Sequence, residues 1–230
     1  MKRKAILLRF TSNDNEFYKS DLDFGLVKHF LQSAQGGCFS EKEIIEFSTN
    51  ESHKKGLLNL IDSVDYSFIY FSGHSAFLDR LIHLQLSDCL IKESELIRKN
   101  KKQWIFLDCC RTSNPSINSP EFSLPRHVDV FTENNEKDYQ NWLTSVSNLE
   151  PFYLLYRTTQ LNEFAFSNEF GGYGTQAFFM TLMEQLKNKK TIDFESLFSI
   201  INSKVKPIQQ CDYLNGNAEL NNYPFKFNYE

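Results

Sequence analysis

Short apolar runs alternate with amphipathic stretches along most of this chain. An apolar run bounded by turn residues is typical of a buried strand, whereas apolar positions at helical spacing, such as Leu22, Leu26 and Phe30, predict a helix with one buried face. This alternation indicates an α/β fold in which helices flank a mostly parallel sheet. The expected strands are Lys4–Phe10, Ile44–Phe47, Tyr66–Phe71, Gln103–Leu107 and Phe152–Tyr156, and the expected helices are Asp21–Leu31, Lys54–Ile61, Thr175–Leu186 and Phe194–Val205.

Three further segments carry weaker patterns. Leu81–Ile91 is expected to form a hairpin. Residues 111–149 are polar and interrupted by proline, which predicts a long surface excursion with a helix near Tyr139–Val146. The chain after Gln210 is expected to be loop with a short strand around Phe225–Phe227. A chain of 230 residues leaves little room for a second core, so we expect one domain over residues 1–230.

The composition excludes some classes of binding partner and indicates the cellular compartment. Hydrophobic residues make up 41% and aromatic residues 15% of the chain, which favours a packed interior. The net charge of -4, with both signs interspersed, offers no basic footprint for nucleic acid or a membrane surface. Five cysteines, including the adjacent Cys109 and Cys110, make a poor disulfide framework and favour a reducing compartment. The apolar run Ala5–Leu8 is too short for a secretory signal, so we expect a cytoplasmic protein.

Two reactive side chains directly follow expected strands. His74 comes after Tyr66–Phe71 and a Ser-Gly turn, and Cys110 comes shortly after Gln103–Leu107. Functional groups gather at the carboxyl ends of parallel strands, because the connecting loops form a crevice there. A thiol attacks a carbonyl as thiolate, and a nearby imidazole can take its proton. Either residue alone is more often structural, but matching partners at two strand ends favour a Cys-His dyad.

These strand ends resemble those of the caspase-like (clan CD, C14-type) cysteine peptidases, which include caspases, metacaspases and paracaspases. Residues 68–74 read Phe-Ile-Tyr-Phe-Ser-Gly-His, and residues 104–111 read Trp-Ile-Phe-Leu-Asp-Cys-Cys-Arg. In that family one apolar strand ends in Ser-Gly-His with the catalytic histidine, and a later strand ends in Asp-x-Cys with the nucleophile. The resemblance implies that Cys110 is the nucleophile, His74 its acid/base partner and Cys109 a core residue. It also implies a three-layer αβα sandwich around a mostly parallel sheet of about six strands.

Further segments are similar to the family in the same order, and two positions depart from it; at one of them, Thr112, Ser or Gly is commoner in the family and the change is expected to be harmless. Residues 156–163 and 174–178 look like the segments that follow the fifth strand of the family, and residues 194–198 with Gln210 are similar to its closing helix and tail. The family places Gly after the catalytic histidine, where this chain has Ser75. The resemblance implies an oxyanion hole from the backbone N–H groups of Ser75 and Cys110, whose geometry depends on the φ that Ser75 adopts.

The resemblance also implies a pocket for a basic side chain. Asp108 stands at the position that lines the first specificity pocket in metacaspases and paracaspases, and Asp23 and Glu163 match the other acidic positions. Converging carboxylates bind a guanidinium through bidentate hydrogen bonds and reject an acidic side chain. We therefore expect cleavage after Arg, and less well after Lys. The alternative for each carboxylate is a structural cap or a solvated charge.

Regulation, cofactors and rival functions complete the expectations. No metal or cofactor is expected, since no zinc spacing or phosphate-binding loop is present; calcium activation, known among metacaspases, has no supporting motif. Arg126 offers a site for self-cleavage. By resemblance the protein takes a protein substrate, works with an activating or recruiting partner, and serves bacterial defence or cell death as monomer or homodimer. The main rival is a catalytically silent caspase-like scaffold or sensor, and the last is a flavodoxin-like binding protein.

Overall fold

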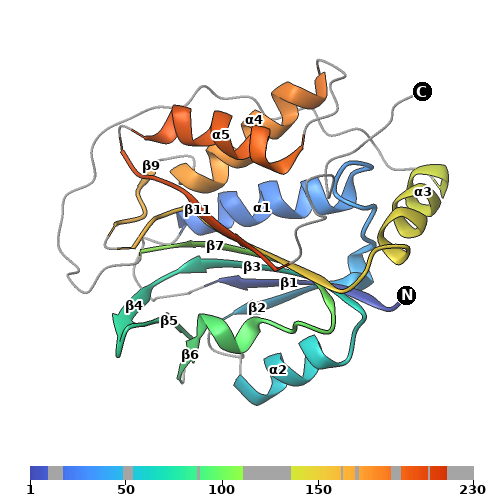
Figure 1. Ribbon diagram of the computed structural model, residues 1–230, viewed down its shortest axis with the longest axis horizontal. Coiled ribbons are helices and arrows are strands. Elements are labelled where there is room, and N and C mark those ends of the chain that lie inside the picture. Colours follow the sequence, from blue (N-terminus) through green and yellow to red (C-terminus); the bar gives the residue numbers. More distant parts are fainter. Residues whose placement is uncertain are drawn as a thin grey trace.

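A six-stranded mixed sheet forms the centre of the molecule, in the order β11-β8-β7-β3-β1-β2 (Figure 1). All strands but one run parallel to their neighbours, and β11 pairs antiparallel with β8. This arrangement confirms the expected α/β sandwich. The strands are β1 (Arg3–Arg9), β2 (Ile44–Ser48), β3 (Tyr66–Gly73), β7 (Lys102–Cys109), β8 (Phe152–Arg157) and β11 (Asp212–Asn215). The structure, a computed structural model, describes residues 1–9, 18–48, 54–86, 89–110, 136–161, 163–168, 171–187, 193–206 and 208–216.

Both faces of this sheet are buried, which explains why its strands are continuous apolar runs. Successive side chains of a strand point to opposite faces. In β3, Phe68 and Tyr70 therefore join one core cluster, while Ile69 and Phe71 join the other. The same alternation in β7 directs the side chain of Cys109 into the second core cluster.

One outer layer is formed by helices, and the other by a helix together with a small sheet (Figure 1). The face of Phe68 and Tyr70 is covered by apolar side chains of helices that cross it, and α3 lies at one end of this layer. The opposite face is covered by one helix, a 3₁₀ turn and a small sheet. The first layer contains α1 (Tyr18–Gln32), α3 (Glu136–Ser147), α4 (Tyr173–Lys187) and α5 (Phe194–Val205), and the second contains α2 (Lys54–Asp62), the 3₁₀ helix η3 (Glu93–Leu96) and strands β4 (Ser75–Leu78), β5 (Leu81–Gln85) and β6 (Leu90–Lys92).

The small sheet extends the hairpin expected over residues 81–91. Strands β5 and β6 pair antiparallel, which confirms that hairpin, but β4 adds a third strand before it. The tight turn between β4 and β5 places Asp79 and Arg80 at φ values of 51° and 63°. Such primed turns usually contain Asn-Gly or Asp-Gly, so Asp-Arg gave no turn signal in the sequence.

Two other elements differ from the sequence expectations. The helix expected near Tyr139–Val146 is found as α3, but it buries Trp142 and Val146 in the main core instead of lying on the surface. The strand found in the tail is β11, a short edge strand with few apolar residues, which explains why its pattern was missed. The expected strand at 225–227 lies outside the described residues. Two short elements complete the described chain: η2 (Glu41–Glu43), and a ribbon of β9 (Ser167–Asn168) and β10 (Gly171–Gly172).

A buried ion pair fastens the end of β8. The guanidinium of Arg157 donates to both carboxylate oxygens of Glu93, at 2.8 and 2.5 Å, and to Asp212 at 3.2 Å. Removing Glu93 leaves the buried guanidinium with Asp212 alone, a longer and more exposed contact, so much of the cost of breaking a buried pair is expected. Glu93→Ala should lower the free energy of unfolding by about 2 to 3 kcal/mol, measured by urea denaturation. As control, Glu184→Ala breaks an exposed pair with Lys204 and should cost less than about 1 kcal/mol.

Candidate active site

Adjacent parallel strands bring the two expected catalytic residues to the same edge of the sheet. Strands β3 and β7 pair in register, with Ser72 beside Asp108 and Gly73 beside Cys109. His74 and Cys110 are the residues that directly follow these two strands. In Figure 1 the carboxyl ends of β1, β3 and β7 point to one end of the molecule, where β4 and β9 also lie. The topology thus places an imidazole and a thiol at neighbouring strand tips.

Strand alternation separates Cys109 from Cys110. Cys109 shares the face of Ile105 and Leu107, is 2% exposed, and burial raises the pKa of its thiol far above the usual value. Cys110 is half-buried at the end of the strand. Since a nucleophile must reach its substrate, this geometry favours Cys110, as the Asp-x-Cys pattern implies.

The thiol of Cys110 lies against the backbone of Ala165. The Ala165 N–H donates to the sulfur at 3.4 Å, and the sulfur lies 3.9 Å from the Ala165 carbonyl oxygen. Burial raises the pKa of the Cys110 thiol and so does the charge of Asp108, whereas the Ala165 N–H lowers it. The sulfur therefore sits in an environment where a backbone donor opposes the cost of burial.

His74 and Ser75 begin the small sheet that follows β3. His74 is exposed, and its carbonyl accepts from the N–H of Gln85 at 3.0 Å. The hydroxyl of Ser75 contacts the Cys110 carbonyl oxygen. Ser75 is not among the described residues with positive φ, so a Cβ is tolerated where the family has glycine. Proton transfer by His74 and an oxyanion hole from Ser75 and Cys110 stay predictions.

Two of the three expected pocket carboxylates come together beside the sheet. Asp108 is 5% exposed and Asp23, from α1, is 2% exposed. Both oxygens of Asp108 are satisfied: the Thr158 hydroxyl donates to Oδ1 at 2.7 Å, and Thr175 donates to Oδ2 from its hydroxyl at 2.5 Å and its N–H at 3.3 Å. Burial raises the pKa of Asp108, and the donors from Thr175 and Thr158 oppose this rise. Asp108 is thus held rigidly, two residues before the thiol.

Asp23 is satisfied on one side only. Its Oδ2 accepts from the N–H of Gly172 at 2.8 Å, whereas its Oδ1 is buried without a hydrogen-bond partner in the described part of the chain. Burial raises the pKa of Asp23 well above its usual value, and the nearby charge of Asp108 adds to the rise. A buried carboxylate oxygen without a donor is costly, and a cation placed against it would remove that cost.

Glycines of strand β10 make the close approach to these carboxylates feasible. A Cβ on Gly171 would lie 2.0 Å from Asp23 Oδ1, and a Cβ on Gly172 would lie 2.2 Å from Asp108 Oδ2. Gly171 also has a φ of 123°, which disfavours a side chain. The Gly171-Gly172 pair therefore forms one wall around the two carboxylates.

Glu163 has different partners from the other two carboxylates. Its Oε2 accepts from the N–H groups of Gln160 and Gln210, at 3.0 and 2.9 Å. These bonds tie the loop after β8 to the C-terminal segment, and the pocket role of Glu163 stays a prediction. The proposed self-cleavage residue Arg126 lies outside the described residues.

Several residues of this site have a role that the sequence does not reveal. Thr158 and Thr175 belong to segments that look like the family, but nothing in one sequence marks them as donors to Asp108. Ala165 and Gln209 carry no sequence signal, since neither a backbone N–H nor a buried amide belongs to a recognisable motif.

Among the residues that the structure describes, no cluster of three or more His, Cys, Asp or Glu side chains is placed to hold a metal ion. No described helix combines the length and apolar character needed to cross a bilayer.

Comparison with known proteins agrees with this architecture. The caspase domain family (Peptidase C14) matches residues 4–223, whereas no curated protein sequence matches the chain. The fold is similar to that of protein GSU0716 from Geobacter sulfurreducens, with a TM-score of 0.58 and 15% identity over 94% of this chain and 93% of that one. It is similar to caspase-1 from Spodoptera frugiperda, with a TM-score of 0.56 and 13% identity over 93% and 88% of the two chains. For the Drosophila initiator caspase Dronc the TM-score is 0.54, with 10% identity over 96% and 85%.

The family match and the fold lead to the same assignment. The matched range contains both strand ends and the acidic pair, and the fold is shared over most of each neighbour's length. Membership of this family supports a function of the cysteine peptidase kind. The chain belongs to the caspase domain family of C14 peptidases.

Proposed function

We propose that this protein is a cysteine endopeptidase that cleaves protein substrates after Arg, and less well after Lys, by a Cys110–His74 dyad. The observation that carries the specificity is the buried acidic pair of Asp23 and Asp108, in which Asp23 Oδ1 lacks a donor. Asp108 lies near the end of β7 and Cys110 follows two residues later, so a side chain bound at the pair would bring its own carbonyl close to the sulfur.

The chemistry follows from the groups at the two strand tips. The Cys110 thiol gives its proton to His74, and the thiolate attacks the peptide carbonyl. The N–H groups of Ser75 and Cys110 hold the oxyanion, and His74 returns the proton to the departing amine. Water then attacks the thioester, which releases the acid and regenerates the thiol.

Specificity follows from electrostatics. An ionised Asp23 is costly in this pocket, because it is buried beside a second carboxylate. A guanidinium supplies several planar donors and a charge that stabilises the ionised form, so Arg is favoured over the single ammonium of Lys. An acidic side chain would bring a third negative charge and is rejected.

Fluorogenic peptides that differ only in the residue before the cleaved bond test this proposal. We expect kcat/KM for Arg to exceed that for Lys by roughly tenfold, with no measurable cleavage after Asp. A matched peptide ending in citrulline, which keeps the shape of Arg without its charge, should also resist cleavage. Preference for Asp would discard the acidic-pocket assignment.

One observation favours the rival reading of a silent scaffold. Burial raises the pKa of the Cys110 thiol, which disfavours the thiolate in this conformation. A peptidyl-Arg chloromethylketone separates the two readings, because an active enzyme is labelled at Cys110 whereas a silent scaffold is not. By resemblance, we also propose a bacterial defence or cell-death role in which a partner protein switches the enzyme on.

A further inference from the structure

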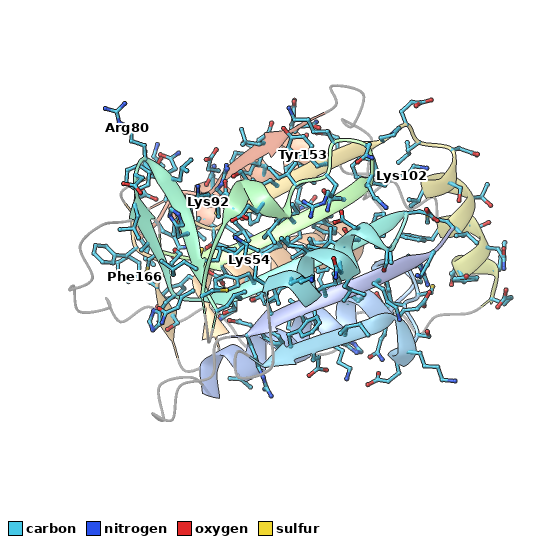
Figure 2. All side chains as sticks on the ribbon, turned by 90° about the horizontal axis from the view of Figure 1, so that it is seen from below. Lys54, Arg80, Lys92, Lys102, Tyr153 and Phe166 are labelled. Atoms are coloured by element: carbon cyan, nitrogen blue, oxygen red, sulfur yellow. The ribbon has the colours of Figure 1, made fainter. Side chains whose placement is uncertain are left out.

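The backbone segment that contacts the nucleophile is held from behind by the C-terminal segment. Gln209 is only 2% exposed. Its side-chain NH₂ donates to the Thr158 carbonyl at 2.8 Å, and its carbonyl oxygen accepts from the N–H of Phe166 at 3.1 Å. One amide thus bridges the end of β8 and the loop that returns toward β9. Figure 2 shows Phe166 at the end of the molecule where Arg80 marks the tip of the small sheet.

The residue between the anchoring points is Ala165, which touches the Cys110 sulfur. On one side of it, the carboxylate of Glu163 accepts from the N–H of Gln210 at 2.9 Å. On the other side, Phe166 is bound through its N–H to Gln209 and through its carbonyl to the N–H of Tyr173, at 2.9 Å. Because the chain is anchored at Glu163 on one side and at Phe166 on the other, these bonds restrain the direction of the Ala165 N–H.

An amide is the side chain that this position requires. The bridge needs a donor and an acceptor in one buried group, which neither a carboxylate nor an apolar side chain provides. Space for it comes from Gly174, where a Cβ would lie 2.9 Å from the Gln209 nitrogen. The bridge is buried, so water cannot easily replace it when the amide is removed.

We propose that Gln209 is a positioning residue for the nucleophile, which holds residues 163–168 so that the Ala165 N–H donates to the Cys110 sulfur. The inference deepens the proposed function, since it concerns the same thiol, but it assumes nothing about the substrate. A backbone N–H stabilises a thiolate more than a neutral thiol, because the bond to the ion is charge-assisted. Releasing the segment therefore makes the thiolate harder to form, while access to the sulfur is kept or increased.

The rate of iodoacetamide alkylation of Cys110 between pH 5 and 10 tests this without any peptide substrate. Mass spectrometry follows the modified peptide, and Cys110→Ala gives the background. In Gln209→Met, which removes both hydrogen bonds at similar volume, the midpoint of the profile should move to higher pH. Alkylation at pH 7 should slow by roughly fivefold, the effect of one hydrogen bond, with the high-pH plateau equal or faster. Gln210→Met, which leaves its backbone N–H in place, should behave as wild type.

A second pair of variants tests the other anchor, and decides the matter if Gln209→Met does not fold. Glu163→Ala removes the carboxylate that accepts from the N–H of Gln210. Glu163→Gln keeps an oxygen that can accept this bond and loses only the negative charge. Loss of a negative charge by itself lowers the pKa of a nearby thiol, so an upward shift in Glu163→Ala alone would come from release of the segment. Unchanged midpoints in folded Gln209→Met and Glu163→Ala would overturn the proposal. Upward midpoints without any cleavage of Arg peptides would refute the proposed function and leave the positioning role intact.

Discussion

Replacing Cys110 with Ala should abolish cleavage of an arginyl peptide, with kcat/KM falling by at least about four orders of magnitude. The thiolate supplies the bond-forming electron pair, and an alanine methyl group has none to offer. The half-buried position of Cys110 at a strand end carries little packing, so circular dichroism and thermal unfolding should match the wild type. The measurement is initial rate at saturating and limiting peptide.

Cys109 provides the matched control, because the same chemical change is made one residue away. Its side chain lies in the core on the opposite face of the sheet. Cys109→Ala should therefore cost about 1 kcal/mol of stability and leave kcat within a few-fold of wild type. If Cys110→Ala retained turnover and Cys109→Ala lost it, the nucleophile would be Cys109; if neither changed turnover, the peptidase would use another residue.

Most of the buried strands and helices could be predicted, because each appears in the sequence as a run or a periodic pattern of apolar residues. Strands buried on both faces need such runs, and β3 and β7 are clear examples. Helix α5 was expected over Phe194–Val205 and is found there, starting at the capping carboxylate of Asp193. The edge strands β4 and β11 could not be predicted, since they are only partly buried and their residues follow no strong apolar pattern.

The sequence predicts only those parts of the site in which a reactive side chain stands within a recognisable motif. His74, Cys110 and Asp108 stand at strand ends in motif order, so their proximity follows from parallel pairing. The wall built by Gly172 and the N–H of Ala165 arise from backbone, and one sequence does not show which backbone groups meet across long separations. Long-range closure, rather than local pattern, decides these contacts.

Substituting Asp23 with Asn should reduce kcat/KM for the arginyl peptide by roughly hundredfold, as expected for loss of a charge-assisted pair in a buried pocket. The amide keeps an acceptor for the Gly172 N–H, so the loss reports the charge and not the anchoring of α1. Peptide kinetics with Arg and citrulline check it, since the difference between the two peptides should shrink. Glu184→Gln, an exposed carboxylate on α4, should change neither rate.

The same substitution should make the protein more stable at neutral pH, because it removes a carboxylate that is costly to ionise in its buried position. Burial raises the folded-state pKa of Asp23, so in the wild type the unfolded chain releases this proton more readily and stability falls as pH rises from the unfolded value toward the folded one. Asparagine has no such dependence, so the gain in Tm of Asp23→Asn should grow over that window and then level off. Lower stability with unchanged selectivity would identify Asp23 as a structural residue and remove it from the pocket. A gain in stability together with lost arginine cleavage is the result expected of a carboxylate kept for its ligand.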